Sequence, residues 1–389
     1  MTIGVFFGSR SPEHDISIVT GQLIISGLKG LGYPVMPIYI SKKGEWLIGD
    51  NLGTIKKFTA GDFDTEKFKK YHLDLEKSQG KLVFRKKGLT GKEIVIDLAF
   101  PAFHGANGED GTFQGLLEMF NVPYVGCDVT SSAITMDKIL TKQICEQQNI
   151  PTAKFVYFAI KEWNKSRIQL LENIREQLGY PVFVKPARLG SSIGIIKAKI
   201  DRELEEAIEV ALHYGERVLI EAAVENLMDL TVSVIGQDEP IPSLIQESVF
   251  GDELFSYDDK YLNDGGTQLG KAMGNLVIPA RLDEKVSAEI RNMAIKVFKV
   301  LGCRGIARVD FLYNKIAKKF LITEVNTLPG TLYHHLWAKS GVELPELLKR
   351  LIQFAQEAHA DKNRYQTTFD SDLLKMAGSI KLKTKKDGG

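Results

Sequence analysis

The chain reads Gly305-Ile306-Ala307-Arg308-Val309-Asp310-Phe311-Leu312-Tyr313 and, shortly afterwards, Phe320-Leu321-Ile322-Thr323-Glu324-Val325-Asn326. Apolar residues alternate with polar ones in both stretches, which predicts two closing β-strands at about 305–313 and 320–325. Side chains two residues apart share a strand face, so Arg308 lies beside Asp310. By the same rule Glu324 lies beside Asn326. The strand pair is therefore predicted to present four polar groups to one side.

This polar face predicts a cation site. Burying unpaired carboxylates costs several kcal/mol, so the arrangement needs a compensating positive charge. Carboxylate and amide oxygens from Asp310, Glu324 and Asn326 suit Mg²⁺, which is usually shared with the phosphates of a substrate. The alternative is an internal pair between Arg308 and a carboxylate that only stabilises the two strands. Four polar groups favour the cation site.

A second candidate site is a loop that follows an apolar strand. It reads Val184-Lys185-Pro186-Ala187-Arg188-Leu189-Gly190-Ser191-Ser192-Ile193-Gly194. Glycines and serines expose backbone N–H groups and hydroxyls to anions, and a lysine adds a point charge. On its own the loop fits an ordinary hairpin turn equally well. It is not a Walker A loop, because the order G-x-x-x-x-G-K-[ST] is absent.

Two further loops follow strands near the N-terminus. One runs from His104 to Gly111, and ligands of open α/β sheets bind beyond the carboxyl ends of strands. Its plainer interpretation is a turn with an acidic helix start at Glu109 and Asp110. The other loop contains Glu13, which could bind an ammonium group or cap a helix.

The order of elements predicts an α/β fold. An apolar run at 2–7, a helical pattern at about 17–31 and a strand at 35–40 begin a parallel sheet. Residues 50–93 are polar and read as an insertion with a hairpin, and the sheet resumes at 94–100. A helix containing Met136-Asp137-Lys138 opens a β-rich section, which one helix at about 201–214 interrupts. An amphipathic helix with its apolar stripe at Val286, Ile290, Met293, Val297 and Leu301 precedes the closing strands.

These patterns divide the chain into four parts. We expect an N-terminal domain at 1–128, a central unit at 129–232, a third unit at 233–355 with the metal and catalytic residues, and a polar tail at 356–389.

Composition excludes several classes of protein. Fifty basic and 49 acidic residues leave a net charge of +1, without the basic excess of a nucleic-acid binder. The chain contains no run of about twenty apolar residues, so no membrane span is predicted. The first predicted strand lacks the basic leader of a signal peptide. Three cysteines without metal-ligand spacing fit a reducing, cytoplasmic location.

The motifs also occur in a characteristic order. The turn with Glu13 is followed by H-G-A-N-G-E-D-G, M-D-K, V-K-P-A-R-L-G-S-S-I-G, D-K-Y, R-V-D and E-V-N-T-L-P-G. From residue 1 to about residue 340 this series resembles the D-alanine–D-alanine ligase family of the ATP-grasp superfamily. The resemblance implies an ATP-grasp fold of the α/β (α+β) class, in which an N-terminal α/β domain precedes two units that clasp ATP.

The resemblance also implies a reaction and its residues. ATP phosphorylates the carboxylate of one D-alanine, and the amine of a second attacks the acyl phosphate to give a dipeptide for peptidoglycan precursors. The implied nucleotide site comprises Lys138, Lys185, Ser191, Ser192, Glu221 at the adenine end, Asp229 at the ribose and Lys260 in a closing loop. Two Mg²⁺ ions, or Mn²⁺, are implied at Asp310, Glu324 and Asn326. The implied catalytic groups are Glu13 at the first ammonium, Ser191 with Tyr261, and Arg308 with the backbone N–H of Gly330 at the oxyanion. The implied substrate contacts are Glu13, His104, Tyr333 and His335.

Two positions depart from the family pattern. Asp229 stands where the family usually has Glu, which shortens the reach to the ribose. His335 falls where a serine normally holds the carboxylate of the second D-alanine. His335 could bind that carboxylate, most strongly when protonated, could reshape the pocket for another nucleophile, or could simply pack beside Trp337.

Two other functions stay open from the sequence alone. One is a related ligase for a different pair of amino or hydroxy acids, and the other is a non-catalytic ATP-binding relative. Amino acids are the expected partners, and the resemblance suggests a homodimer.

Overall fold

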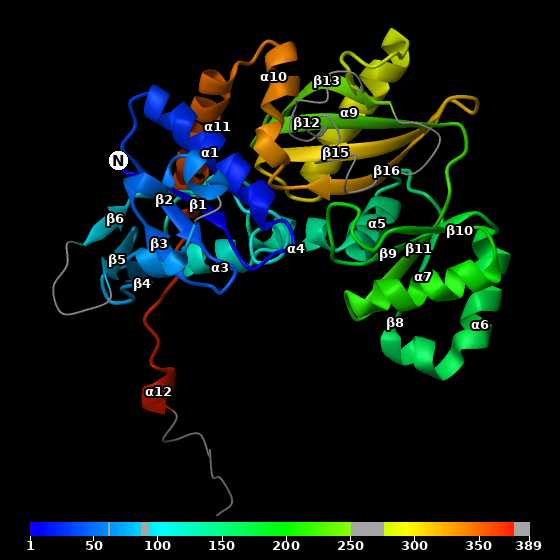
Figure 1. Ribbon diagram of the computed structural model, residues 1–389, viewed down its shortest axis with the longest axis horizontal. Coiled ribbons are helices and arrows are strands. Elements are labelled where there is room, and N and C mark those ends of the chain that lie inside the picture. Colours follow the sequence, from blue (N-terminus) through cyan, green and yellow to red (C-terminus); the bar gives the residue numbers. More distant parts are fainter. Residues whose placement is uncertain (61–62, 87–92, 250–275, 377–389) are drawn as a thin grey trace, which may run out of the picture.

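The computed structural model describes residues 1–60, 63–86, 93–249 and 276–376, which form three β-sheets with helices packed against them (Figure 1).

The first sheet has seven strands in the order β6-β5-β4-β3-β2-β1-β7. Their bounds are β1 (Ile3–Gly8), β2 (Val35–Ile40), β3 (Trp46–Ile48), β4 (Lys70–Leu73), β5 (Leu82–Lys86), β6 (Ile94–Ile96) and β7 (Leu98–Pro101). Strand β1 pairs in parallel with β2 and β7, whereas the remaining neighbours are antiparallel. The expected parallel start of the sheet is confirmed for β1, β2 and β7, and the expected hairpin within 50–93 is formed by β4 and β5. The expectation that this segment is an insertion interrupting the sheet was wrong, because β4 and β5 are strands of the same mixed sheet.

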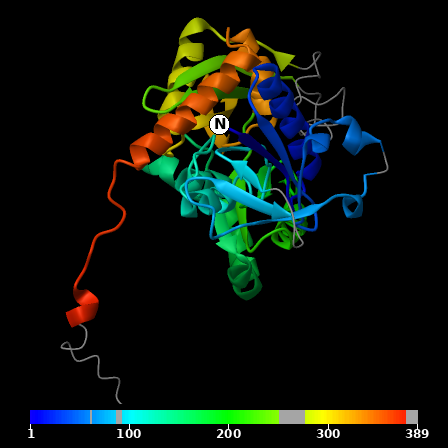
Figure 2. The same ribbon diagram turned by 90° about the vertical axis from the view of Figure 1, so that its left-hand side faces the viewer.

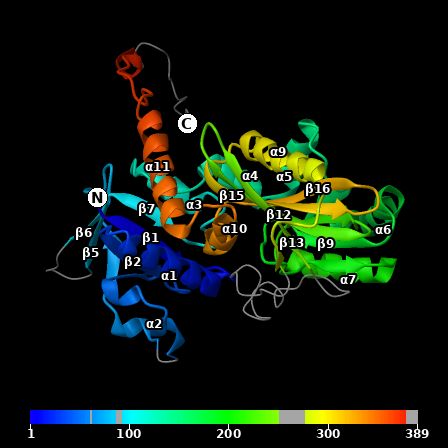
Figure 3. The same cartoon turned by 90° about the horizontal axis from the view of Figure 1, so that it is seen from above.

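Helices from both ends of the chain cover this sheet. They are α1 (His14–Gly30), α2 (Lys56–Thr59), α3 (Thr112–Met119) and α11 (Leu344–Lys362), with short 3₁₀ turns at Asp50–Leu52 and Thr65–Lys67. In the described structure Leu348 and Leu351 of α11 share one core with Ile3 and Ile25, and α11 lies beside α1 (Figure 3). The expected start of a polar tail at residue 356 falls inside α11.

The second sheet is antiparallel and has four strands in the order β10-β9-β11-β8. Its elements are β8 (Phe155–Ala159), α6 (Ile160–Leu178), β9 (Val182–Pro186), β10 (Ile196–Ala198), α7 (Asp201–His213) and β11 (Arg217–Ala222). Val182 and Val184 are two residues apart and so point to the same face of β9, where they pack with Leu204 and Ile208 of α7. Helix α6 also packs into this core, although the sequence predicted only α7 here.

The third sheet is antiparallel, with strands in the order β14-β13-β12-β15-β16. Its elements are β12 (Leu227–Gly236), β13 (Ile241–Ser248), β14 (Leu276–Val277), α9 (Glu284–Val300), β15 (Gly305–Asn314), β16 (Lys319–Asn326), a 3₁₀ turn (Gly330–Tyr333) and α10 (His334–Lys339). Asp283 caps α9 by accepting from the Val286 backbone N–H at 2.9 Å, and the predicted stripe places Val286, Ile290 and Val297 in the core.

Helices α4 (Val129–Met136) and α5 (Lys138–Gln147) pack against this third sheet, and α5 also contacts the second sheet, where Ile139 shares a small core with Leu219 of β11. Strand β12 also belongs wholly to the third sheet, so the expected division between residues 232 and 233 falls inside a strand.

Beyond α11 the chain leaves the body of the molecule and forms the short helix α12 (Leu373–Met376) (Figures 1 and 2). Within the described residues, none of the helices has the length and apolar character needed to cross a membrane.

Candidate active site

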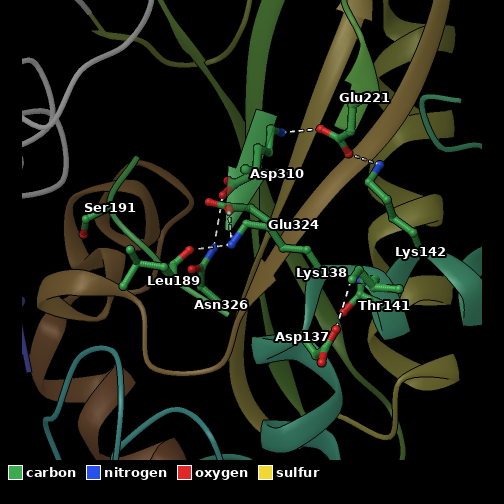
Figure 4. Close-up of polar contacts among 12 residues, drawn as sticks. Asp137, Lys138, Thr141, Lys142, Leu189, Ser191, Glu221, Asp310, Glu324 and Asn326 are labelled. Carbon is green, nitrogen blue, oxygen red and sulfur yellow. Dashed lines mark hydrogen bonds and ion pairs between the residues drawn. The ribbon is translucent and has the colours of Figure 1, made fainter. Parts of the chain in front are cut away.

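Strands β15 and β16 bring the four predicted polar groups together, and Figure 4 shows Asp310, Glu324 and Asn326 among them. Arg308 lies opposite Asn326, and Asp310 lies opposite Glu324, with a bulge after Asp310. The Arg308 Nε donates to both oxygens of Asp310, at 3.0 and 2.9 Å, and Asn326 Nδ2 donates to Asp310 Oδ2 at 3.2 Å. One Arg308 nitrogen also lies 3.4 Å from Glu324 Oε1. The prediction of a shared polar face is confirmed.

Two carboxyl groups, Asp310 and Glu324, lie opposite each other at this face. Burial raises the pKa of the Asp310 carboxyl although the neighbouring Arg308 opposes that shift. The internal ion pair that the sequence left as an alternative is present, and the same carboxylates stand beside a pocket lined by Glu324 and Asn326. Among the described residues no three His, Cys, Asp or Glu side chains are grouped to hold a metal. A cation here would take two carboxylates, an amide and further oxygens from a substrate.

Lys138 lies between this polar face and the loop at residues 187–195 that follows β9, called here the Gly190 loop. Its Nζ donates to the Leu189 carbonyl at 2.6 Å and lies 3.8 Å from Glu324 Oε2, while its backbone N–H donates to the Ala187 carbonyl at 3.0 Å. The sequence predicted one helix through Met136-Asp137-Lys138. That prediction was wrong, because Asp137 breaks the chain into α4 and α5 with a ψ of 101°.

Asp137 is a buried junction that sequence reasoning missed. Its Oδ1 caps α5 by accepting from the N–H groups of Ile139 and Leu140, both at 3.2 Å. Its Oδ2 accepts from Arg188 Nε at 2.8 Å and from Arg217. One fully buried carboxylate thus ties the start of α5 to the Gly190 loop and to β11.

Asp137→Asn is expected to lower the free energy of unfolding by about 1–3 kcal/mol, because the amide still caps α5 but loses the charge that pairs with two arginines. Urea unfolding measures the change. Asp128→Asn is the matched control, since Asp128 caps α4 through the Ser131 N–H at 2.8 Å and pairs with no arginine among the described residues. An equal loss in both variants would contradict the account.

Glu221 is held between two lysines. Lys142 Nζ lies 2.5 Å from Glu221 Oε1, and Lys185 Nζ pairs with the other oxygen (Figure 4). Burial alone would raise the pKa of Glu221, but Lys142 and Lys185 lower it to about 2. Lys142 was missed by the sequence analysis. Its spacing of four residues from Lys138 would have placed both lysines on one helix face.

Glu13 faces the Gly190 loop from the N-terminal sheet. Ser191 Oγ donates to Glu13 Oε1, and the Glu13 side chain makes no capping hydrogen bond to α1. Glu13 therefore occupies the N-cap position of α1, but its carboxylate points to the Gly190 loop instead of capping the helix. A Cβ atom at Gly105 would come within 2.5 Å of Glu13 Oε2, and one at Gly190 within 3.0 Å. Glycine at both positions lets two separate loops close around this carboxylate.

Glu109 is a second carboxylate in the same place. It accepts from the Gly105 N–H at 2.7 Å and the Leu328 N–H at 3.4 Å. Burial and the charge of Glu13 raise the pKa of Glu109 to about 8. The acidic helix start predicted here holds only for Asp110, which accepts from the Thr112 N–H at 3.0 Å. Glu109 lay in a segment singled out from the sequence, but only the fold turns its side chain inward.

Two adjoining pockets connect these groups. One is lined by Glu109, Thr135, Met136, Lys138, Leu189, Gly190, Glu324, Val325, Asn326 and Thr327. The other is lined by Glu13, His104, Glu109, Ser191, Arg308, Asn326, Leu328, Pro329 and Gly330. Glu109 and Asn326 belong to both, so the pocket on the lysine side and the pocket on the Glu13 side lie next to each other.

His104 connects α1 with the turn that follows β16. Its Nε2 shares a hydrogen bond with Thr20 Oγ1 at 2.8 Å, and the same oxygen accepts from the Thr331 N–H at 3.0 Å. Burial lowers the pKa of His104 to about 3, so the ring is neutral at ordinary pH.

Tyr333 and His335 lie behind Arg308. In the part of the chain that the structure describes, neither lines the two pockets. Burial lowers the pKa of His335 to about 4, so it carries no positive charge for a carboxylate at neutral pH. His335 lies in the first turn of α10, which begins at His334.

The remaining predicted residues are spread around the site. Ser192 follows Ser191 in the Gly190 loop, both with positive φ, and Asp229 lies on β12 opposite Ser248 and Leu312. Lys260 and Tyr261 lie outside the described residues.

Comparisons with known proteins agree along the whole chain. Residues 2–127 match the family model described as D-ala D-ala ligase N-terminus, and residues 144–353 match the model for its C-terminus. A D-alanine–D-alanine ligase of Thermosipho melanesiensis is 38% identical over 97% of this chain and 99% of its own length. The same-named protein of Chloroherpeton thalassium is 39% identical over 92% of this chain and 97% of its own length.

Solved structures agree as well. The D-alanine–D-alanine ligase of Coxiella burnetii has a TM-score of 0.77 and 28% identity, covering 94% of this chain and 96% of that one. The VanG D-Ala:D-Ser ligase of Enterococcus faecalis has a TM-score of 0.77 and 30% identity, and the match covers 91% of this chain and 99% of that one. The predicted ATP-grasp fold is confirmed.

Proposed function

The chain belongs to the D-alanine–D-alanine ligase family, and from that premise we propose that it joins two D-alanine molecules through an acyl phosphate made with ATP. The product is a dipeptide for peptidoglycan precursors.

The adjacency of the two pockets carries this proposal. Lys138 and Glu324 line the side suited to phosphates, while Glu13 and Arg308 line the side suited to an amino acid. A carboxylate bound between them would meet the terminal phosphate of ATP near Asn326, which borders both pockets.

Asp310, Glu324 and Asn326 fit Mg²⁺, because they offer hard oxygen ligands at a face where burial raises the pKa of Asp310. We propose that they hold two Mg²⁺ ions, with Mn²⁺ as a substitute. When bound, the metal neutralises the negative charge of the phosphates.

The protein's own groups position the reactants. Glu13 binds the ammonium of the first D-alanine, and the Ser191 hydroxyl holds the Glu13 carboxylate in place. Arg308 and the Gly330 N–H stabilise the oxyanion that forms when the second amine attacks. His104 keeps the Gly330 turn docked on α1 and so helps to shape the substrate pocket.

The nucleotide side is assigned by resemblance to the family. Lys138, Lys185 and the Gly190 loop with Ser192 hold the phosphates, and the adenine and ribose lie toward Glu221 and Asp229. Lys185, which forms an ion pair with Glu221, also contacts the phosphates. Lys260 and Tyr261 belong to the segment proposed to exclude water.

We also propose a cytoplasmic homodimer. The reaction needs ATP, which the cytoplasm supplies. The three cysteines are buried free thiols, which fits a reducing compartment.

The test is ADP release with Mg-ATP in the presence of D-alanine, L-alanine, D-serine and D-lactate, singly and in pairs, with products read by mass spectrometry. Release that depends on D-alanine and yields D-alanyl-D-alanine supports the proposal. Release only with another pair would instead make this a related ligase for a different pair of amino or hydroxy acids. ATP binding without any release across the panel would contradict both.

A further inference from the structure

Three successive residues after Gly330 adopt a left-handed backbone conformation. Thr331, Leu332 and Tyr333 have φ values of 49°, 56° and 49°, and none is glycine. This conformation crowds the Cβ atom against the backbone, so it persists only where the surroundings impose it. All three side chains are buried. The turn is therefore a strained segment held in place beside the active site.

The turn delivers the Tyr333 ring to the face of the Arg308 guanidinium. The guanidinium carbon lies 5.1 Å from the ring centroid, within the range of a cation–π contact. Asp310 and Glu324 hold the guanidinium by its nitrogens. Carboxylates fix its edge, and the tyrosine supports its face.

The tyrosine is held in turn by strand β13. Gln246, which is 1% exposed, accepts from His335 Nε2 at 2.7 Å, and it also hydrogen-bonds the Tyr333 hydroxyl. The Tyr333 and His335 rings lie 5.0 Å apart. Gln246 pairs across the strands with Thr231, whose hydroxyl donates to Asp310 at 2.8 Å. The same two strands thus fix both the carboxylate and the ring that hold Arg308.

We propose that Tyr333 is a positioning residue for Arg308, and that the left-handed turn with Gln246 and His335 forms the layer that keeps the guanidinium aimed at the reacting carbonyl. This inference rests on the proposed function only for the role of Arg308. It assigns His335 to the supporting layer instead of to the carboxylate of the second substrate.

The test compares Tyr333→Leu with Tyr333→Phe. Leucine removes the aromatic face, and we expect kcat to fall roughly 10- to 100-fold with the KM for ATP nearly unchanged, because misplacing a catalytic group costs rate and not nucleotide binding. Phenylalanine keeps the face, and kcat should stay within about threefold of the wild type. Circular dichroism and urea unfolding confirm that both variants fold.

A double-mutant cycle separates positioning from simple packing. In an Arg308→Ala background, Tyr333→Leu should leave the residual kcat unchanged, because there is no guanidinium left to aim. In unfolding, the two changes should be coupled by roughly fivefold in the equilibrium constant, a readout that needs no activity. Additive effects on kcat, or coupling below about twofold in unfolding, would overturn the inference. A wild-type protein without ADP release would sink the proposed function, whereas the unfolding cycle would still decide whether Tyr333 holds Arg308.

Discussion

Replacing Arg308 by Ala is expected to lower kcat by about 10²- to 10³-fold while ATP affinity changes little. The guanidinium is 4% exposed and lines the pocket on the Glu13 side, where negative charge develops during attack of the amine. An interaction made mainly in the transition state affects turnover more than substrate binding. Steady-state ADP release and calorimetric ATP binding measure the two quantities separately.

The variant also removes the arginine that pairs with both Asp310 and Glu324, so folding must be checked. Arg308→Lys keeps the charge but loses the planar fork, and it should fold with a smaller loss of kcat. Arg281→Ala is the matched control, because Arg281 pairs with Glu247 on β13 of the same sheet and its side chain is 62% exposed. Equal losses of ATP binding and turnover in Arg308→Ala would contradict the oxyanion role.

Replacing Glu221 by Ala is expected to lower the free energy of unfolding by about 3–5 kcal/mol. The substitution leaves Lys142, 1% exposed, and Lys185, 12% exposed, beside each other without a counter-charge. Glu205→Ala is the control, because its partner Arg167 lies 2.9 Å away and both side chains are exposed. That variant should lose less than about 1 kcal/mol.

The same carboxylate predicts an acid-dependent stability. Lys142 and Lys185 overcome the effect of burial and lower the pKa of Glu221 from 4.5 to about 2. A lowered pKa contributes stability above the unfolded value of 4.5, and that contribution disappears as the pH falls from 4.5 toward 2. The shift corresponds to about 3 kcal/mol. Urea unfolding from pH 5 to pH 2.5 should show this loss in the wild type and a shallower slope in Glu221→Gln. Identical slopes would contradict the assignment.

The strand pair at the centre of the site was predictable because its signal is local. Apolar alternation places Arg308 and Asp310 on one face whatever the rest of the chain does. The order of motifs then identified the family, and the helix at α9 followed from its apolar stripe.

Other features depend on contacts that no local pattern contains. Helix α6 has few fully buried residues and so a weak apolar stripe, and the short strands β4 and β5 acquire their place only by pairing within the first sheet. The inward turn of Glu109 depends on Leu328, far along the chain. Asp137 likewise meets Arg217 only after the sheets assemble. The position of Tyr333 needs a backbone conformation that its sequence disfavours.

Oxygen transfer tests the central claim most directly. The enzyme is incubated with Mg-ATP and D-alanine labelled with ¹⁸O in its carboxylate, and the phosphate and dipeptide are analysed by mass spectrometry. Attack of the carboxylate on ATP forms an acyl phosphate whose bridging oxygen carries the label. Attack of the second amine then breaks the carbon–oxygen bond and leaves that oxygen on phosphate. The account predicts labelled phosphate in equal amount to D-alanyl-D-alanine. Dipeptide formation with unlabelled phosphate, or ADP release without dipeptide, would contradict it.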